Sequence, residues 1–234
     1  MAKNVDYELQ DAAVLDKTVE DNYTDLSAKG FNQQRKEKLH NSIVTARTKE
    51  TAQQKAVKHV NEKTAGQNTA TEQGTQLIVK IQNAAKSAYG SDPASLKRYR
   101  IGETKPRGIG GLLGWMNYFQ TLLVENDDDL LANGLMQEDI TAFGNCLTVL
   151  TSADTVQENA KKLQKAATLA RDSAVEAMKE EVNKTRSFVK AAFQGNKEML
   201  VKFKPIPKGR VSSDTQESAQ TTTETSNTTT TPGA

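Results

Sequence analysis

Two residues one helical turn apart, Glu37 and His40, have the spacing of a metal-binding element. In di-iron helical bundles such a Glu-x-x-His pair supplies two ligands from one helix face, and a second pair plus two more carboxylates complete the site. The other histidine, His59, follows Ala56 and therefore has no carboxylate at this spacing. We expect no metal or other cofactor, and we interpret Glu37 and His40 as helix residues that face solvent.

A glycine-rich run at residues 108–114 is similar to a phosphate-binding loop. Its third glycine comes one residue late for the Gly-x-Gly-x-x-Gly pattern, and the mechanism requires a strand before the loop and a helix after it. No strand is expected ahead of this run. Arg107 and the start of the following helix could still hold an anion, but a plain linker is the simpler interpretation.

Aromatic side chains gather directly after this run, at Trp115, Tyr118 and Phe119, and include the only tryptophan of the chain. Together with Arg107 they are candidates for an interaction surface. The alternative is that they form the core of their part of the chain. The core is favoured by the apolar neighbours Leu112, Leu122 and Leu123.

Cys146 is the single cysteine, so neither an intrachain disulfide nor a cysteine-based metal cage can form. A reactive thiol needs a basic or histidine-paired environment, and no such residue is near in sequence. We therefore expect Cys146 to be a small buried residue.

The chain matches itself when it is displaced by 104 residues. Residues 25–31 (Asp-Leu-Ser-Ala-Lys-Gly-Phe) then fall on residues 129–135 (Asp-Leu-Leu-Ala-Asn-Gly-Leu), and the match continues without a gap to Arg100. Duplicated helical units usually pack on each other around a shared core. The repeat predicts two tandem copies.

The repeat also bears on the metal-binding pair. At this displacement Glu37 and His40 fall on Thr141 and Gly144, neither of which can complete the ligand set of a di-iron site. A metal-dependent enzyme is therefore improbable on sequence grounds.

Helices are expected wherever apolar residues recur every three or four positions. The first covers residues 8–20, and a one-turn segment follows Asp25 and ends at Gly30. The proline-free stretch 32–89 is one continuous helix, a hairpin that turns at residues 63–68, or a helix broken near residues 47–52, which match the weak point at residues 151–154 in the second copy. The repeat favours the continuous helix, because the second copy has strong helix formers at the corresponding positions.

The middle of this stretch has the composition of a coiled coil, but Glu50, Gln53, Gln67 and Gly74 interrupt the heptad. We interpret it as a seam of small residues that lets helices approach closely within a monomeric bundle.

The sequence predicts four regions. These are a first helical copy at residues 1–101, a basic Gly/Pro-rich linker at 102–111, a second helical copy at 112–204 and a tail at 205–234. The tail is rich in Ser and Thr, and a segment so poor in apolar residues is expected to be disordered.

The composition limits the function further. The 31 basic and 29 acidic residues nearly cancel, and the net charge of +2 provides no field for binding nucleic acid. We recognise no apolar segment of a signal peptide at the start, and the most apolar run, residues 112–124, is shorter than the roughly 20 residues of a membrane span. A cytoplasmic location is therefore expected, and membrane association is the less favoured alternative.

The sequence thus predicts an all-α protein, an antiparallel bundle of long helices built from two copies related by a pseudo-twofold axis. The expected function is structural or protein-binding without enzymatic activity, with another protein or a second copy of the chain as partner. The alternative is a sensor or membrane-surface module that uses the aromatic helix at residues 112–124.

Overall fold

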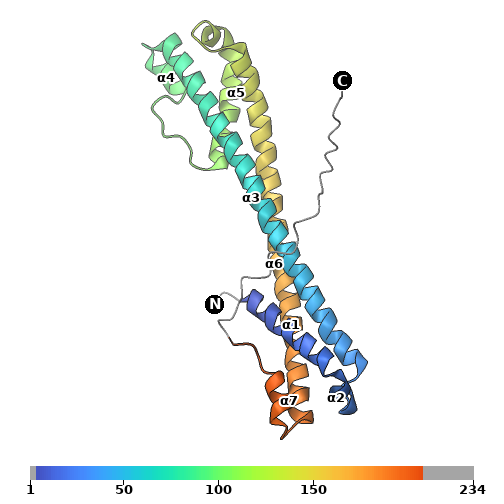
Figure 1. The fold of residues 1–234 in the computed structure, drawn as a ribbon. Helices are drawn as coiled ribbons and strands as arrows, with labels where there is room; N and C mark the ends of the chain where they lie inside the picture. The colour runs from blue at the N-terminus through green and yellow to red at the C-terminus, as the bar shows by residue number, and fades with distance from the viewer. Residues whose placement is uncertain (1–3, 208–234) are drawn as a thin grey trace, which may run out of the picture. The chain divides into compact units, whose positions relative to one another are not determined.

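The structure is a computed structural model that describes residues 4–207, apart from the side chains of Asn126 and Asp127. Over these residues the secondary structure is entirely helical (Figure 1). In chain order the helices are α1 (Val5–Asp21), α2 (Tyr23–Ala28), α3 (Gln33–Tyr89), α4 (Pro93–Arg98), α5 (Ile109–Leu131), α6 (Gln137–Ala192) and α7 (Lys197–Lys202). The all-α fold class predicted from the sequence is confirmed.

The two longest helices, α3 and α6, have 57 and 56 residues and pack side by side (Figure 1). Neither contains proline, and neither is interrupted. The turn considered at residues 63–68 does not form. Gly66 lies inside α3, and its cost of about 1 kcal/mol relative to alanine is too small to break a helix that packs on both sides of it.

The surface of α3 that faces α6 follows a heptad pattern. One series of its buried and half-buried positions alternates by three and four residues: Ala46, Glu50, Gln53, Val57, Val60, Thr64, Gln67, Thr71, Gly74, Ile78, Ile81 and Ala85. In the central part of this seam Arg171 Nε lies 3.7 Å from Glu50 Oε2. Gln67 Nε2 donates a 2.8 Å hydrogen bond to Asp154.

Polar residues therefore interrupt the apolar heptad on this surface of α3. Glu50, Gln53 and Gln67 occupy seam positions, and Gly74 faces the side chains of Met116 and Cys146. Gln67 has a hydrogen-bond partner on α6 in Asp154, whereas Glu50 Oε2 is buried without a hydrogen bond and lies 3.7 Å from Arg171 Nε. Polar residues at such positions fix the register of two helices at some cost in stability.

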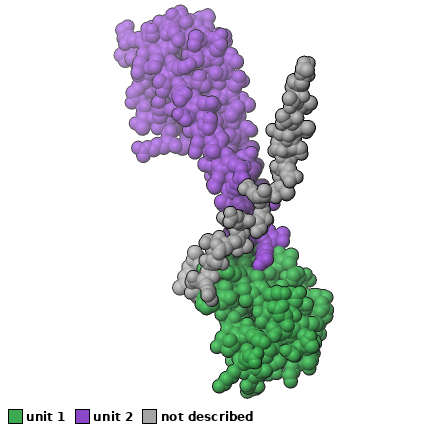
Figure 2. Space-filling view, viewed as in Figure 1, with its two compact units in different colours: residues 1–46, 174–234 green, residues 47–173 purple. Residues whose placement is uncertain are grey.

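The chain forms two compact units (Figure 2). Unit 1 comprises residues 1–46 and 174–234, and unit 2 comprises residues 47–173. Each unit therefore contains parts of both long helices. The unit boundaries do not coincide with the boundaries between the two predicted copies.

The core of unit 2 is built around α5. Met116 and Phe119 on this helix are completely buried and pack with residues of α3 and α6. Gly74 makes room for this contact, because a Cβ atom there would lie 2.8 Å from Met116 Sδ and the methionine side chain would have to move. Other members of the core are Ile78, Ile81, Ala85, Tyr99, Leu112, Trp115, Leu123, Leu130, Phe143 and Leu150.

The connection from α4 to α5 belongs to unit 2 and is partly held by its core. Tyr99 is buried, and Gln82 Nε2 donates hydrogen bonds of 3.1 and 3.2 Å to the carbonyl oxygens of Tyr99 and Arg100. The helix that follows starts at Ile109, three residues before the position expected from the sequence. Residues 109–111 of the predicted linker are thus part of α5.

The core of unit 1 combines the first 46 residues with the end of the chain. Its buried members are Val5, Ala12, Leu15, Val19, Leu26, Phe31, Leu39, Ile43, Ala46, Val175, Met178, Val182, Val189, Phe193, Met199 and Phe203. Gly30, which follows the C-cap of α2, has a positive φ of 92°. This is the glycine that the sequence predicted at the end of this one-turn helix.

The described part of the predicted tail, residues 205–207, lies against α1. Ile206 N donates to Asp11 Oδ1 at 3.0 Å, and the Tyr7 hydroxyl donates to the Ile206 carbonyl at 2.7 Å. Residues 208–234, on which the prediction of disorder mainly rests, lie outside the described residues.

Candidate functional site

The aromatic residues singled out on α5 are used inside unit 2. Trp115 and Phe119 are buried, with ring centroids 6.3 Å apart, and Phe119 also lies 6.5 Å from Tyr99. Tyr118 is half-buried, and its hydroxyl donates to the Arg98 carbonyl at 2.9 Å. These side chains therefore attach α5 to the connection that follows α3.

Arg100 covers the outer side of this aromatic group. Its guanidinium carbon lies 5.2 Å from the Trp115 ring and 4.9 Å from the Tyr118 ring, which are cation–π distances. Arg100 adopts a positive φ of 51°, which is uncommon for a residue other than glycine. The outer side of the Trp115 and Tyr118 rings is thus covered by Arg100 of the same chain.

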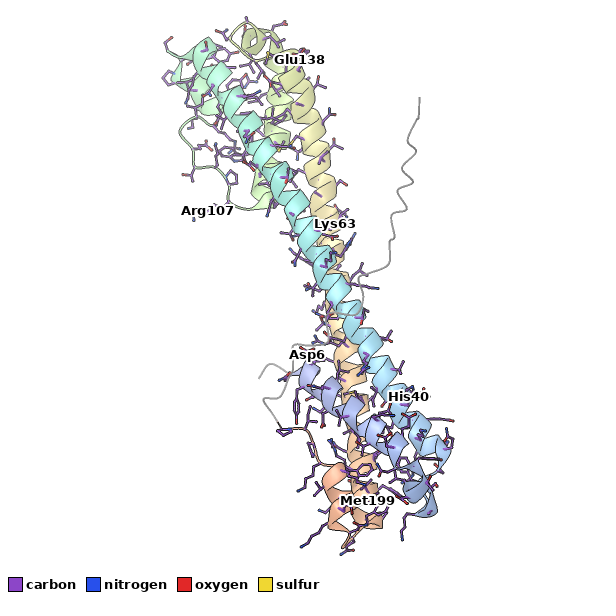
Figure 3. The ribbon with its side chains drawn as sticks, viewed as in Figure 1. Asp6, His40, Lys63, Arg107, Glu138 and Met199 are labelled. Carbon is purple, nitrogen blue, oxygen red and sulfur yellow. The ribbon has the colours of Figure 1, made fainter. Side chains whose placement is uncertain are left out.

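The fourth residue of the predicted surface, Arg107, is exposed in the loop before α5 (Figure 3). Among the described residues, no hydrogen bond or ion pair joins it to the aromatic side chains. The structure brings Trp115, Tyr118 and Phe119 together and leaves Arg107 apart from them.

The glycine-rich run before α5 has a packing role. A Cβ atom on Gly111 would lie 2.7 Å from Pro106 Cβ, so the close approach of the loop to α5 requires glycine there. Gly108 is the N-cap of the helix and provides no side-chain hydrogen bond. This packing accounts for one of the glycines that suggested a phosphate loop.

The candidate metal-binding pair, Glu37 and His40, is exposed on α3 in unit 1, and Figure 3 labels His40. His40 Nδ1 is 2.8 Å from Asp16 Oδ2, and Glu37 Oε1 accepts a hydrogen bond of 3.0 Å from Gln33. Within residues 4–207, as far as their side chains are described, no three His, Cys, Asp or Glu residues are grouped to hold a metal ion. His59 is exposed farther along α3.

Cys146 is buried, as the sequence predicted. Its Sγ lies 3.5 Å from the Ala70 carbonyl oxygen, and burial raises the pKa of the thiol. A raised pKa disfavours the thiolate, which is the reactive form. The arrangement suits a packing role.

An ion pair between α3 and α6 holds unit 2 at the start of α6. Lys80 Nζ lies 2.6 Å from Asp139 Oδ1, and Asp139 Oδ2 accepts the Met136 amide at 3.3 Å. The hydrogen bond from Lys80 is the main reason that the pKa of Asp139 is lowered. The carboxylate of Asp139 is 11% exposed, whereas Lys80 is 53% exposed.

Without Lys80, the free energy of unfolding should change less as the pH falls into the acidic range. Because the folded-state pKa of Asp139 lies below its unfolded value, this pair stabilises the fold above the ordinary aspartate pKa and is lost as pH falls through the folded pKa. Lys80→Ala should lower the free energy of unfolding at pH 7 by about 1 kcal/mol or less, given the exposure of the lysine.

Urea unfolding of both proteins at pH 7 and at pH 3 measures this effect. The difference in the free energy of unfolding between the unmodified protein and Lys80→Ala should be smaller at pH 3 than at pH 7. Lys58→Ala is the control, because Lys58 is an exposed lysine of α3 that forms no ion pair within the described residues. An equal difference at both pH values would contradict the role of the ion pair.

Sequence reasoning missed a groove of about 630 Å³ in unit 1. It is lined by Phe31, Arg35, Lys38, Glu180, Glu181, Asn183, Lys184, Thr185, Ser187 and Phe188. The rings of Phe31 and Phe188 lie 5.2 Å apart, and the guanidinium carbon of Arg35 lies 5.0 Å from the Phe188 ring. No local pattern signals this groove, because its two sides are about 150 residues apart in the chain.

The helices of the described part of the chain include none that is both long enough and apolar enough to cross a membrane. Comparison of the whole chain with protein-family models, with characterised proteins and with solved structures finds no significant match in any of the three.

Proposed function

We propose that this chain is a non-enzymatic, protein-binding helical protein whose two tandem copies pack as a fused, pseudo-twofold antiparallel pair. The repeat in the sequence motivates the architectural part of this proposal. The exposed side chains of α6 motivate the binding part. We also propose a cytoplasmic location, in keeping with a single cysteine that is buried and unpaired.

The positions of the helices support the two copies. α5 starts 104 residues after α1, α6 starts 104 residues after α3, and α7 starts 104 residues after α4 (Val5 and Ile109, Gln33 and Gln137, Pro93 and Lys197). The one clear difference is the break between α1 and α2, which has no counterpart in α5. Two segments whose helices start at the same displacement are expected to share one fold.

Contacts at matching positions support the same interpretation. Gln82 donates to the Tyr99 carbonyl at 3.1 Å, and Arg186, at the matching position, donates to the matching Phe203 carbonyl, also at 3.1 Å. The seam pair Glu50 and Arg171 likewise matches the pair Asp154 and Gln67. Each of these seam pairs joins one copy to the other.

The single observation that carries the binding function is an exposed apolar stripe on α6. Val149, Val156 and Leu163 follow each other at seven-residue intervals and are 55%, 39% and 64% exposed. The matching positions of α3 are Thr45, Ala52 and His59. A row of exposed apolar side chains on one helix face can form part of a protein-binding surface, and this stripe belongs to only one of the two proposed copies.

The matched positions provide the test. A photo-crosslinking amino acid at Leu163 should yield a discrete adduct in lysate of the native cell, and the same amino acid at His59 should not. The mass of the adduct distinguishes a different protein from a second copy of this 25.6 kDa chain. Absence of an adduct at Leu163, or the same adducts at both positions, would contradict the proposal.

The alternative, a sensor or membrane-surface module, depends on the aromatic side chains of α5. Burial of Trp115 and Phe119 weighs against it, because side chains that insert into lipid must be accessible. If the intact protein floated with liposomes that contain anionic lipid, this result would support the membrane-surface alternative.

A further inference from the structure

Matching positions of the two units differ in charge at the groove of unit 1. In unit 2 Asp139 and Lys80 form the 2.6 Å ion pair between α6 and α3. The residues 104 positions away are Arg35 and Lys184, which line the groove from α3 and α6. Two cations cannot pair with each other, so unit 1 lacks the bridge that Asp139 forms in unit 2.

The groove also has an aromatic floor that unit 2 lacks. Phe188 takes the position that Ala84 has in unit 2, and its ring lies 5.2 Å from that of Phe31. The guanidinium of Arg35 lies over Phe188. Apolar contact area and a cation are therefore side by side in the same groove.

The basic side chains around the groove differ in their ion-pair partners. Lys184 lies 2.8 Å from Glu180 and 2.9 Å from Glu181, both on its own helix. In the part of the chain that the structure describes, no carboxylate forms an ion pair with Arg35 or Lys38. An incoming anion therefore meets two basic side chains whose charges are not yet neutralised.

We propose that this groove binds an acidic peptide segment of a partner protein, in which a carboxylate side chain is flanked by an apolar side chain. The carboxylate binds Arg35, whose planar guanidinium can donate two parallel hydrogen bonds, and Lys38 adds charge. The apolar neighbour lies on Phe31 and Phe188. The identity of this ligand rests on the proposed protein-binding function, but the groove is a different surface from the stripe on α6.

Other anions fit less well. Glu180 and Glu181 border the groove, and they would repel the many charges of a nucleic acid or an anionic membrane. A single carboxylate can approach the basic side without this penalty. The volume of about 630 Å³ lies in the usual range for small-ligand sites and accommodates two or three side chains.

Fluorescence anisotropy of a labelled peptide with the core Phe-Asp-Leu tests the proposal on the intact protein. The same peptide with Phe-Asn-Leu is the uncharged comparison. Binding of the Asp peptide should be at least tenfold tighter than binding of the Asn peptide, and the preference should weaken with added salt because charged contacts are screened.

The decisive variant is Arg35→Asp, which places a carboxylate opposite Lys184 as in unit 2. It should abolish binding while leaving the thermal unfolding midpoint unchanged or higher, which separates loss of binding from loss of folding. Lys58→Asp is the matched control, because it makes the same change of charge at an exposed position of unit 2. This control should bind the peptide as the unmodified protein does.

Equal binding of the two peptides, or unchanged binding by Arg35→Asp, would overturn the inference. Failure of the unmodified protein to bind the Asp peptide would overturn it as well. None of these results affects crosslinking at Leu163, so the groove and the proposed function can fail independently.

Discussion

Residues 1–104 and 105–234, produced as separate chains, should each fail to form a folded monomer and should regain native helical structure when they are mixed. Both hydrophobic cores draw on both segments. The core of unit 1 joins residues 5–46 to residues 175–203, and the core of unit 2 joins residues 70–99 to residues 112–150. Neither segment can bury its apolar faces alone, and helix formation in water depends on that burial.

Trp115, the only tryptophan, reports this assembly because it lies in the second segment and is packed in the core of unit 2. On mixing, its emission should move to shorter wavelength and become shielded from iodide, while circular dichroism reports the gain of helix. The control is the intact chain cleaved after folding in the loop between α4 and α5, which should stay associated.

Two outcomes would contradict this prediction. One is a fragment that sediments as a monomer and unfolds cooperatively by itself. The other is a tryptophan spectrum that does not change on mixing. Either would mean that a segment folds on its own, and the proposed fused pair would have to be abandoned.

Arg186→Gln should destabilise the protein strongly. Arg186 donates two 2.8 Å hydrogen bonds to the carboxylate of Asp11, and the two side chains are only 19% and 11% exposed. Removing one partner of a buried pair leaves an uncompensated charge and typically costs 3–5 kcal/mol; we expect about 3 kcal/mol because both groups retain some contact with water. Glutamine is the residue at the matching position of the other copy, so it can still bond to the Phe203 carbonyl.

Urea unfolding measures this loss, and Asp11→Asn in the Arg186→Gln background should recover part of it, because no carboxylate is then left unpaired. Lys184→Gln is the control, as this lysine is 58% exposed and should change stability by less than about 0.5 kcal/mol. A loss below about 1 kcal/mol for Arg186→Gln would show that the pair adds little to the stability of unit 1.

Several features followed directly from the sequence. The all-helical fold, the helix end near Gly30 and the burial of Cys146 were predicted, because spacing, glycine and neighbouring residues act locally.

The pairing of residues far apart was decided only by the tertiary structure. Glu50 and Gln67 look like interruptions of a heptad until Arg171 and Asp154 are placed opposite them on α6. The cost of burying a polar group depends on its partner, and the sequence does not say which partner that is.

The same reason applies to the candidate sites. The sequence identified Trp115 as chemically distinctive, but whether its ring binds a partner or fills a core depends on what packs over it, and Arg100 and Phe119 do so. The groove around Arg35 and Phe188 has no local signal at all. It exists because α3 and α6 bring side chains together that are about 150 residues apart, and distance in space is set by packing of the whole chain.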